Sequence, residues 1–308
     1  MDPFLDDQGN LKHGLDNLDS MEAGNLFIVL YRETKDERYH HAAQQIRDRL
    51  KDSYPRTHEG AFWHGTTRQW QTWLDGIYMS MPLLVRYGEL FNDSQYANDE
   101  ATKQFIVYAK NVGESPTGLL YHAYDESGQQ PWADPVKHHS SQFWCRAIGW
   151  YGMALVDVLE MLPKDHPQRP QLIALVQRLA KAYAKYQDPE TGLWFEVVDR
   201  ADVPENWLET SSSSMYTYML SRAVERGYIG KEYVKVAEKG YRGVLASITR
   251  NADGTISIPN ICEGTNVGDL AFYLARARRT NDLHGMGAFI IMNEQMRKTA
   301  GNGAVGAN

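Results

Sequence analysis

The chain has 308 residues, of which 43% are hydrophobic, and its formal net charge is −7. This length and apolar content suffice for a large buried core in one domain or two, whereas the acidic balance argues against a nucleic-acid partner, which usually requires a basic face. No apolar run reaches the roughly 18 residues of a membrane span, and the acidic start lacks a signal-peptide core, so we expect a cytoplasmic protein without a membrane partner, or a periplasmic one if a signal was removed.

A recurring glycine punctuates the chain. Each is followed by a short stretch that looks extended, and the positions are Gly9, Gly60, Gly118, Gly192 and Gly254. Glycines that recur in the same kind of segment every several tens of residues are typical of a repeat architecture.

Two kinds of helical pattern follow each glycine. The first kind is apolar on most sides and covers 26–31, 73–87, 143–162 and 214–224, and a helix that is apolar all round is buried all round. The second kind is amphipathic and covers 37–50, 98–109, 171–186 and 231–246. This alternation predicts an inner and an outer ring, so the expected fold is all-α, an (α/α)6 barrel of helical hairpins. One catalytic domain would cover 1–300, and 301–308 would be a flexible tail.

The count of repeats predicts an incomplete ring. Inner helices are expected near residues 20, 75, 142, 213 and 267, each with an outer partner. A closed ring needs six hairpins, so we expect the first to be missing, with an open edge between 19–50 and 268–298. Apolar side chains would face this edge. A homodimer that covers it and a shortened form with weakened activity are the two interpretations, because monomers rarely expose such patches.

Aromatic and polar side chains gather where the chain enters the inner helices. Ser, Thr and Asp precede these helices, and helix N-termini favour anions. Trp63, Trp70, Trp132, Trp194 and Trp207 lie in or beside the connecting loops, and Trp73 starts an inner helix. A rim of this kind is typical of a sugar platform. Trp144 and Trp150 lie within an inner helix and are expected in the core.

Two acids stand out on this rim. Asp75 opens an inner helix in "WLDG", and Asp134 lies in "WADP". A structural interpretation makes Asp75 a helix cap and Asp134 an Asx turn. A functional interpretation makes them a carboxyl pair of the kind that sugar chemistry uses. Both interpretations remain open from the residues alone.

Candidate basic groups are fewer. Arg68 and Lys137 are the better candidates for a substrate carboxylate, whereas Arg146 is expected to be buried and to need an acid or carbonyl partner. The two cysteines, Cys145 and Cys262, form no cluster with each other or with histidine. A disulfide framework, a metal site and a cofactor are therefore not expected.

Several motifs in this order resemble a known family. The segments "QTWLDGIYMSMPLL", "WADP" followed by "SSQFWCRAIGWYGMAL", "WLETSSSSMYTYML" and "NDLHGMGAFIIMNE" are similar to the unsaturated rhamnogalacturonyl hydrolases of glycoside hydrolase family 105. They are more distantly similar to the unsaturated glucuronyl hydrolases of family 88. The resemblance implies a six-hairpin α/α barrel and an oligosaccharide substrate that ends in a 4,5-unsaturated uronic acid. It also implies hydration of that double bond, with protonation at carbon 4 and addition of water at carbon 5.

The resemblance also assigns residues. Asp134 matches the family's general acid/base, and Asp75 matches its second essential carboxylate, which would hold ring hydroxyls and raise the pKa of Asp134. The expected substrate-binding residues are Trp132, His122, Trp207, Trp73, Trp63, His64, Arg68 and Lys137.

Two other functions remain as alternatives. A sugar 2-epimerase on the same barrel would use His64 and His284 as its acid/base pair and leave Asp134 structural. A non-catalytic protein would bind oligosaccharide without turnover.

Overall fold

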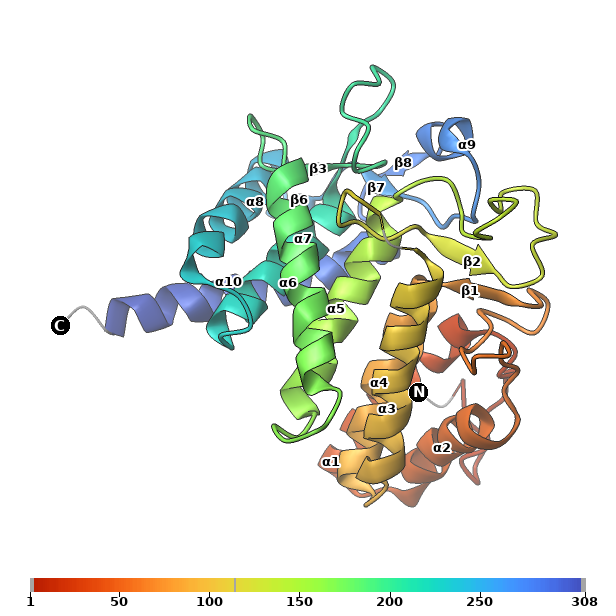
Figure 1. The fold of residues 1–308 in the computed structure, drawn as a ribbon. Helices are drawn as coiled ribbons and strands as arrows, with labels where there is room; N and C mark the ends of the chain where they lie inside the picture. The colour runs from red at the N-terminus through yellow and green to blue at the C-terminus, as the bar shows by residue number, and fades with distance from the viewer. Residues whose placement is uncertain (1–2, 114, 306–308) are drawn as a thin grey trace.

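The structure is a computed structural model that describes residues 3–113 and 115–305, with side chains to residue 299. Long helices dominate it (Figure 1). The inner ones are α1 (Gly24–Thr34), α3 (Asp75–Leu90), α5 (Cys145–Met161), α7 (Thr210–Glu225) and α10 (Leu283–Val305). The outer ones are α2 (Glu37–Asp48), α4 (Ser94–Asn111), α6 (Arg169–Tyr186) and α8 (Val234–Ser247). The predicted alternation of inner and outer helices is confirmed.

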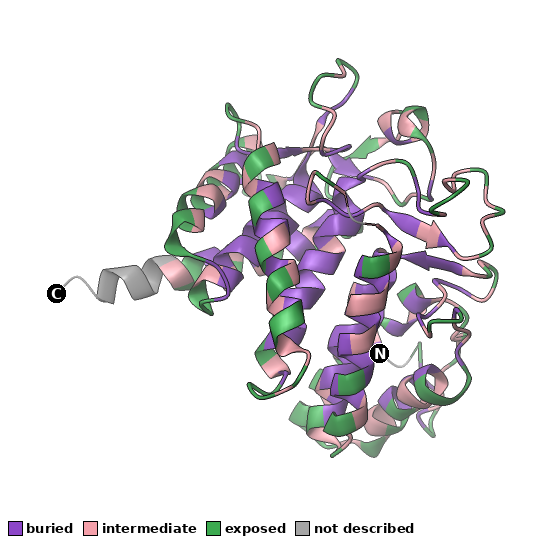
Figure 2. Ribbon diagram, viewed as in Figure 1, coloured by how far each residue is buried: buried purple, intermediate pink, exposed green. Residues whose placement is uncertain are grey.

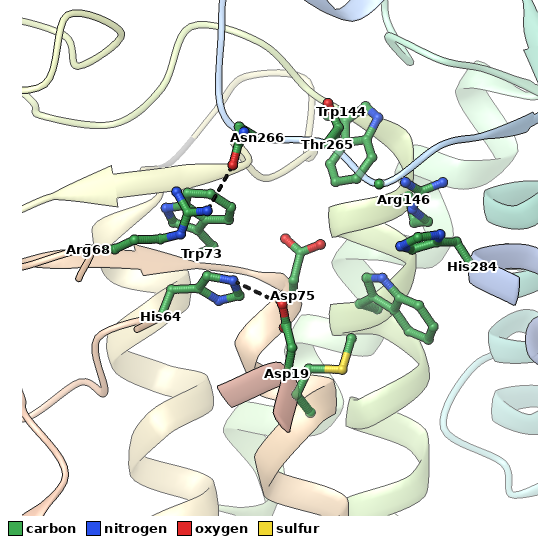
Figure 3. A pocket seen from close by; sticks show the side chains of 13 residues that line it. Asp19, His64, Arg68, Trp73, Asp75, Trp144, Arg146, Thr265, Asn266 and His284 are labelled. Atoms are coloured by element: carbon green, nitrogen blue, oxygen red, sulfur yellow. Dashed lines mark hydrogen bonds and ion pairs between the residues drawn. The ribbon is translucent and has the colours of Figure 1, made fainter. Parts of the chain in front are cut away.

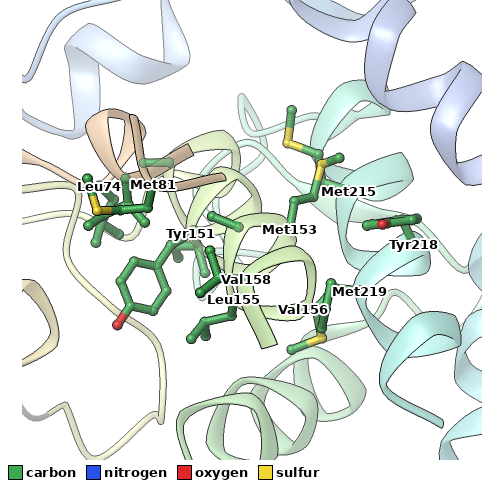
Figure 4. Packing of buried hydrophobic residues seen from close by; sticks show 14 of the residues in the cluster. Leu74, Met81, Tyr151, Met153, Leu155, Val156, Val158, Met215, Tyr218 and Met219 are labelled. Atoms are coloured by element: carbon green, nitrogen blue, oxygen red, sulfur yellow. The ribbon is translucent and has the colours of Figure 1, made fainter. Parts of the chain in front are cut away.

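The central inner helices α3, α5 and α7 are buried because their apolar residues face neighbours on several sides. Helix α3 packs on α5, α5 on α7, and α7 on α10. Figure 2 shows α3, α5 and α7 mostly buried, whereas α6 and α8 alternate buried and exposed residues. In Figure 4 the side chains of α5 lie between Met81 of α3 and Met215 of α7. A single apolar core therefore runs through the consecutive inner helices.

The five recurring glycines occupy the same kind of turn. All have φ between 80° and 85°, a left-handed conformation that L side chains rarely adopt. A Cβ on Gly9 would meet the backbone of Arg38 in α2, and one on Gly192 would meet Lys239 in α8. Gly60 and Gly118 face side chains of α4 and α6 in the same way. In the first four repeats the glycine thus allows the turn to lie directly against the outer helix of its own repeat.

The fifth repeat departs from the prediction. A Cβ on Gly254 would meet no described atom within 4 Å, and the expected hairpin over 268–298 is wrong. This segment instead forms the short α9 (Leu270–Leu274) and the single helix α10, whose backbone also takes in residues 301–305 of the expected tail. Residues 306–308 lie outside the described part. The described residues thus contain five inner and four outer helices, and the expected last outer helix is not among them.

Apolar side chains are exposed on the first and last inner helices, as expected for an open edge. Leu26 and Val29 of α1 are 48% and 51% exposed, and Ile290 of α10 is 55% exposed. Helix α1 packs mainly on α2 and α3, and α10 packs on α7.

Short antiparallel strand pairs tie the rim loops together. They are β1 (Gln71–Trp73) with β2 (Ala123–Asp125), β3 (Trp194–Phe195) with β4 (Leu208–Glu209), β5 (Thr249–Arg250) with β6 (Ile256–Ser257), and β7 (Ile261–Cys262) with β8 (Arg278–Arg279). In the first pair Trp73 lies opposite Ala123, so the last residue of β1 and the first residue of β2 meet near the start of α3. Three single-turn helices, η1 (Leu18–Met21), η2 (Arg49–Ser53) and η3 (Lys231–Tyr233), complete the elements.

Candidate active site

A pocket opens where the N-terminal ends of α3, α5 and α10 converge (Figure 3). Its cavity volume is about 400 Å³, which is within the range of small-ligand sites. It is lined by Asp19, His64, Arg68, Trp73, Asp75, Met79, Trp144, Arg146, Trp150, Gly264, Thr265, Asn266 and His284. The prediction that loops leading into inner helices form a site of mixed aromatic, acidic and basic character is therefore supported by the geometry.

Asp75 is the carboxylate held most firmly in this pocket. It is the first residue of α3, and its side chain is 13% exposed. Leu74, not Asp75, is the N-cap of the helix, so the capping interpretation is wrong. The carboxylate instead accepts a hydrogen bond from Nε2 of His122 at 3.1 Å. His122 is fully buried behind the pocket wall, as is suitable for a group that orients a carboxylate.

The charge of Asp75 follows from these contacts. Burial raises its pKa, but the imidazoles of His122 and His64 outweigh burial, so the pKa of Asp75 lies below its ordinary value. Burial also lowers the pKa of His122, more than Asp75 raises it. The pair is therefore an ionised Asp75 that accepts a hydrogen bond from a neutral imidazole.

Stacked aromatic and basic groups form one wall. The His64 ring stacks on Trp73 with centroids 4.4 Å apart. The Arg68 guanidinium lies over Trp73, 4.3 Å from its centroid, and donates a hydrogen bond to Asn266 at 2.9 Å. Among the described residues no acidic side chain forms an ion pair with Arg68, so its charge remains available to an anion.

Arg146 forms the floor. It is 1% exposed and donates hydrogen bonds to the backbone carbonyls of Cys262 and Glu263, at 2.5 and 2.7 Å. These are the carbonyl partners expected for a buried arginine. Trp144 lies 4.6 Å from its guanidinium. Trp144 lies in the core as expected and Trp150 packs against it, and both also line the pocket.

Asp134 lies in a different environment. Its Oδ1 accepts hydrogen bonds from the backbone N–H groups of Lys137 and Val136 at 2.6 and 2.9 Å, which is the predicted Asx turn. These two bonds lower the pKa of Asp134, and Asp75 is not among the causes. The expectation that Asp75 raises the pKa of Asp134 is therefore wrong in this structure. Asp134 is also not among the residues that line the pocket.

The remaining predicted site residues divide into two groups. His64, Arg68 and Trp73 line the pocket with Asp75, and Trp132 packs against the Trp73 cluster beside it. Trp63, Trp207 and Lys137 are not among the lining residues. Trp194 is fully buried and donates a hydrogen bond to the Tyr183 carbonyl, so its place is in the core.

Some lining residues were missed from the sequence. Asp19 in η1 contributes a second carboxylate, with Oδ2 at 3.6 Å from Nε2 of His64. No sequence pattern identifies Thr265, Asn266 or Met79 as site residues. Met79 lies in an apolar helical pattern that is typical of the core, and the other two lie in an irregular loop. The described residues contain no cluster of three or more His, Cys, Asp or Glu side chains suited to a metal ion, and none of their helices is long and apolar enough to cross a membrane.

Known proteins resemble nearly the whole chain. The solved glycoside hydrolase of family 105 from C. acetobutylicum has 35% sequence identity and a TM-score of 0.93, covering 97% of this chain and 85% of that one. "Unsaturated rhamnogalacturonyl hydrolase YesR" of Bacillus subtilis is 26% identical over 271 residues, which are 86% of this chain and 72% of the relative. "Protein Atu3128" of Agrobacterium fabrum is 36% identical over 170 residues, 55% of this chain and 71% of the relative.

The model of glycosyl hydrolase family 88 matches residues 1–300. The family 105 relative and this match agree with the resemblance found in the motifs. The chain therefore belongs to glycosyl hydrolase family 88, with family 105 enzymes among its structural relatives, and is a glycoside hydrolase.

Proposed function

We propose that the chain releases a 4,5-unsaturated uronic acid from the non-reducing end of oligosaccharides, pectin-derived rhamnogalacturonan fragments in particular. The observation that carries this proposal is the ionised Asp75, fixed by a neutral His122 inside an aromatic pocket with two arginines. A hexuronate can donate hydrogen bonds from its hydroxyls to Asp75, stack a face of its ring on the tryptophans and bind an arginine through its own carboxylate. The name of the YesR relative supports the same substrate class.

Arg68 is the group that binds the substrate carboxylate in this proposal. Its guanidinium is stacked on Trp73 and has no acidic partner among the described side chains. Arg146 is less suited, because two backbone carbonyls already accept from it and Glu209 lies 3.8 Å away. A planar guanidinium matches a carboxylate with two parallel hydrogen bonds.

Asp134 supplies the proton in this proposal. The substrate double bond takes a proton at carbon 4, water adds its hydroxyl at carbon 5 and returns a proton to the acid/base, and the resulting hemiketal opens to release the remaining sugar. A half-buried carboxyl whose turn lowers its pKa is a poor acid near neutral pH. Because the WADP loop adjoins the pocket wall through Trp132, a bound oligosaccharide would cover the loop, exclude water and raise the pKa of Asp134.

The test is loss of the ultraviolet absorbance of the unsaturated uronate when the protein is given an unsaturated rhamnogalacturonan disaccharide. Turnover supports the proposal. Binding of the disaccharide without loss of absorbance would instead identify a non-catalytic binding protein.

The sugar 2-epimerase alternative keeps one observation in its favour, since His64 and His284 both line the pocket, but membership of glycosyl hydrolase family 88 argues against it. His284 is oriented by Asp282, which accepts from its Nδ1 at 2.6 Å. An epimerase would leave the unsaturated uronate intact and would tolerate Asp134→Asn.

We also propose a homodimer in which a second copy covers the exposed apolar residues of α1 and α10. Leu26→Ser combined with Val29→Ser should shift the mass measured by light scattering from dimer to monomer. A wild-type protein that is monomeric at high concentration would refute this.

A further inference from the structure

Tyr273 connects the pocket loop to the catalytic carboxylate through a buried hydrogen-bond chain. It lies in α9, and its side chain is fully buried. The backbone N–H of Gly268 donates to the Tyr273 hydroxyl at 3.3 Å, and this hydroxyl lies 2.7 Å from Nδ1 of His122. The other ring nitrogen of His122, Nε2, lies 3.1 Å from Oδ2 of Asp75.

The chemistry of the end groups sets the direction of this chain. The Gly268 amide can only donate, so the Tyr273 oxygen accepts there and its own hydrogen is free for His122. Asp75 is ionised and can only accept, so Nε2 of His122 carries a hydrogen. Burial raises the pKa of Tyr273, so it stays a phenol, and burial lowers the pKa of His122, so its ring stays neutral. Nδ1 is then an acceptor, which matches the hydroxyl that faces it.

We propose that Tyr273 is a positioning residue that holds His122 in the Nε2–H tautomer and thereby fixes the ionised carboxylate of Asp75. Without the hydroxyl, the carboxylate of Asp75 is the one remaining polar partner among the described side chains that opposes the Nδ1–H tautomer. In that tautomer a lone pair on Nε2 would face the negative Oδ2 of Asp75, and the carboxylate would lose its hydrogen bond.

The same hydroxyl links this carboxylate to the pocket loop that also accepts a hydrogen bond from Arg68. Gly268 ends the loop that carries Thr265 and Asn266, both of which line the pocket. A single phenol therefore connects the loop of the last repeat, through His122, to Asp75 of the second repeat.

A merely structural role for Tyr273 makes different predictions. Its ring lies 6.0 Å from Trp144 and 5.9 Å from His122 between centroids, so the ring itself contributes packing. Tyr273→Phe keeps this ring and removes only the hydroxyl. Tyr151→Phe is the matched control, because Tyr151 is also fully buried and donates to the Phe105 carbonyl at 2.7 Å, outside the pocket lining.

The primary measurement is the ¹⁵N spectrum of the histidine side chains at neutral pH, with His122→Gln used to assign the His122 signals. In the wild-type protein His122 should have a protonated Nε2 and a bare Nδ1. Tyr273→Phe should give a mixture of tautomers or Nδ1–H, and Tyr151→Phe should match the wild type. This measurement needs no substrate, so it stands apart from any failure of the proposed hydrolase function.

Turnover gives the second readout and rests on the proposed function. Losing one neutral hydrogen bond that acts through His122 should lower kcat by about 3- to 10-fold in Tyr273→Phe and leave it unchanged in Tyr151→Phe. A wild-type His122 that is Nδ1–H or doubly protonated would overturn the proposal without any variant. An unchanged Nε2–H signal in Tyr273→Phe would overturn it as well, as would a changed tautomer with wild-type turnover of the unsaturated disaccharide.

Discussion

The first turn of α3 and the WADP loop each present an aspartate, and the two are held in opposite ways. Asp75 is 13% exposed and its carboxylate meets an imidazole from another repeat. Asp134 lies in an exposed turn and its carboxylate meets the backbone of its own next residues. Both pKa values lie below the ordinary value, one despite burial and the other without it. Covering the site with a substrate therefore changes the surroundings of Asp134 far more than those of Asp75.

The largest expected effect comes from removing the acid. Asp134→Asn should lower turnover of the unsaturated disaccharide by about 10²–10⁴-fold, the usual contribution of a general acid/base. The matched control is Asp253→Asn, another exposed turn whose Oδ1 accepts from the backbone N–H and hydroxyl of Thr255. Equal activity in the two variants would show that Asp134 serves only its turn, and the acid would then be sought among the carboxylates inside the pocket.

Asp75→Asn should lower turnover by about 10²–10³-fold, as when one preorganised polar group is removed from a catalytic site. The amide keeps the shape but loses the charge, and its NH₂ group competes with the Nε2–H of His122. Steady-state rates with the same disaccharide measure this. A larger loss than in Asp134→Asn would reverse the two roles and make Asp75 the proton donor.

The comparison of these two acids also shows what the sequence could supply. Alternating apolar patterns predicted α1 to α8, because burial on all sides or on one side leaves a periodic trace. The motif "WLDG" led to Asp75, and "WADP" led to both an acid and an Asx turn. Tyr273, Thr265 and Asn266 escaped detection, because α9 and the loop before it have no periodicity and meet Asp75 only through folding. The fifth hairpin was predicted from the repeat count alone, and the count did not reveal that residues 283–305 form one helix without an outer partner among the described residues.

Arg68→Met should raise KM by about 10- to 100-fold with a smaller effect on kcat, because a hydrogen bond to a charged group contributes about 1.5–3 kcal/mol. Methionine keeps the apolar stem over Trp73. Arg278→Met is the matched control, since that guanidinium lies over Trp207 at 4.8 Å and is not among the pocket residues. Unchanged KM in Arg68→Met, or an equal rise in both variants, would remove Arg68 as the carboxylate-binding group.

The pH dependence separates the free and occupied states of Asp134. Its pKa is lowered in the free protein, so the acid form is lost early as pH rises, and kcat/KM should fall from a low pH onward. Bound substrate raises the pKa by excluding water, so the alkaline limb of kcat should lie at higher pH than that of kcat/KM. Coincident limbs would mean that substrate does not bury Asp134.

Glu196 extends the comparison because its side chain is even more deeply buried than that of Asp75 but has no imidazole donor. Its carboxylate accepts from Trp144 Nε1 at 2.8 Å and from the Cys262 thiol at 3.0 Å. Burial, and then the nearby Glu209, raise its pKa from 4.5 to about 7. Burial therefore raises the pKa of Glu196, whose donors are weak, whereas at Asp75 the contact with His122 outweighs burial and lowers the pKa.

The smallest effect on activity and the clearest on stability should come from Glu196→Gln. The unfolded chain loses this proton near pH 4.5 and the folded chain near 7, so the contribution of Glu196 to stability is full below pH 4.5 and is lost as pH rises through about 7. This shift corresponds to roughly 3 kcal/mol. Glutamine does not titrate, so the melting temperature of the variant relative to wild type should rise between pH 5 and pH 8.

Glu225→Gln is the control of opposite sign. Burial raises the pKa of Glu225, but Gln295 and Arg222 outweigh burial and lower it, so this substitution should cost stability above the ordinary carboxyl pKa and lose its effect in acid. A difference between Glu196→Gln and wild type that stays constant with pH would mean that Glu196 is ionised in the folded protein, and that burial alone does not explain the contrast with Asp75.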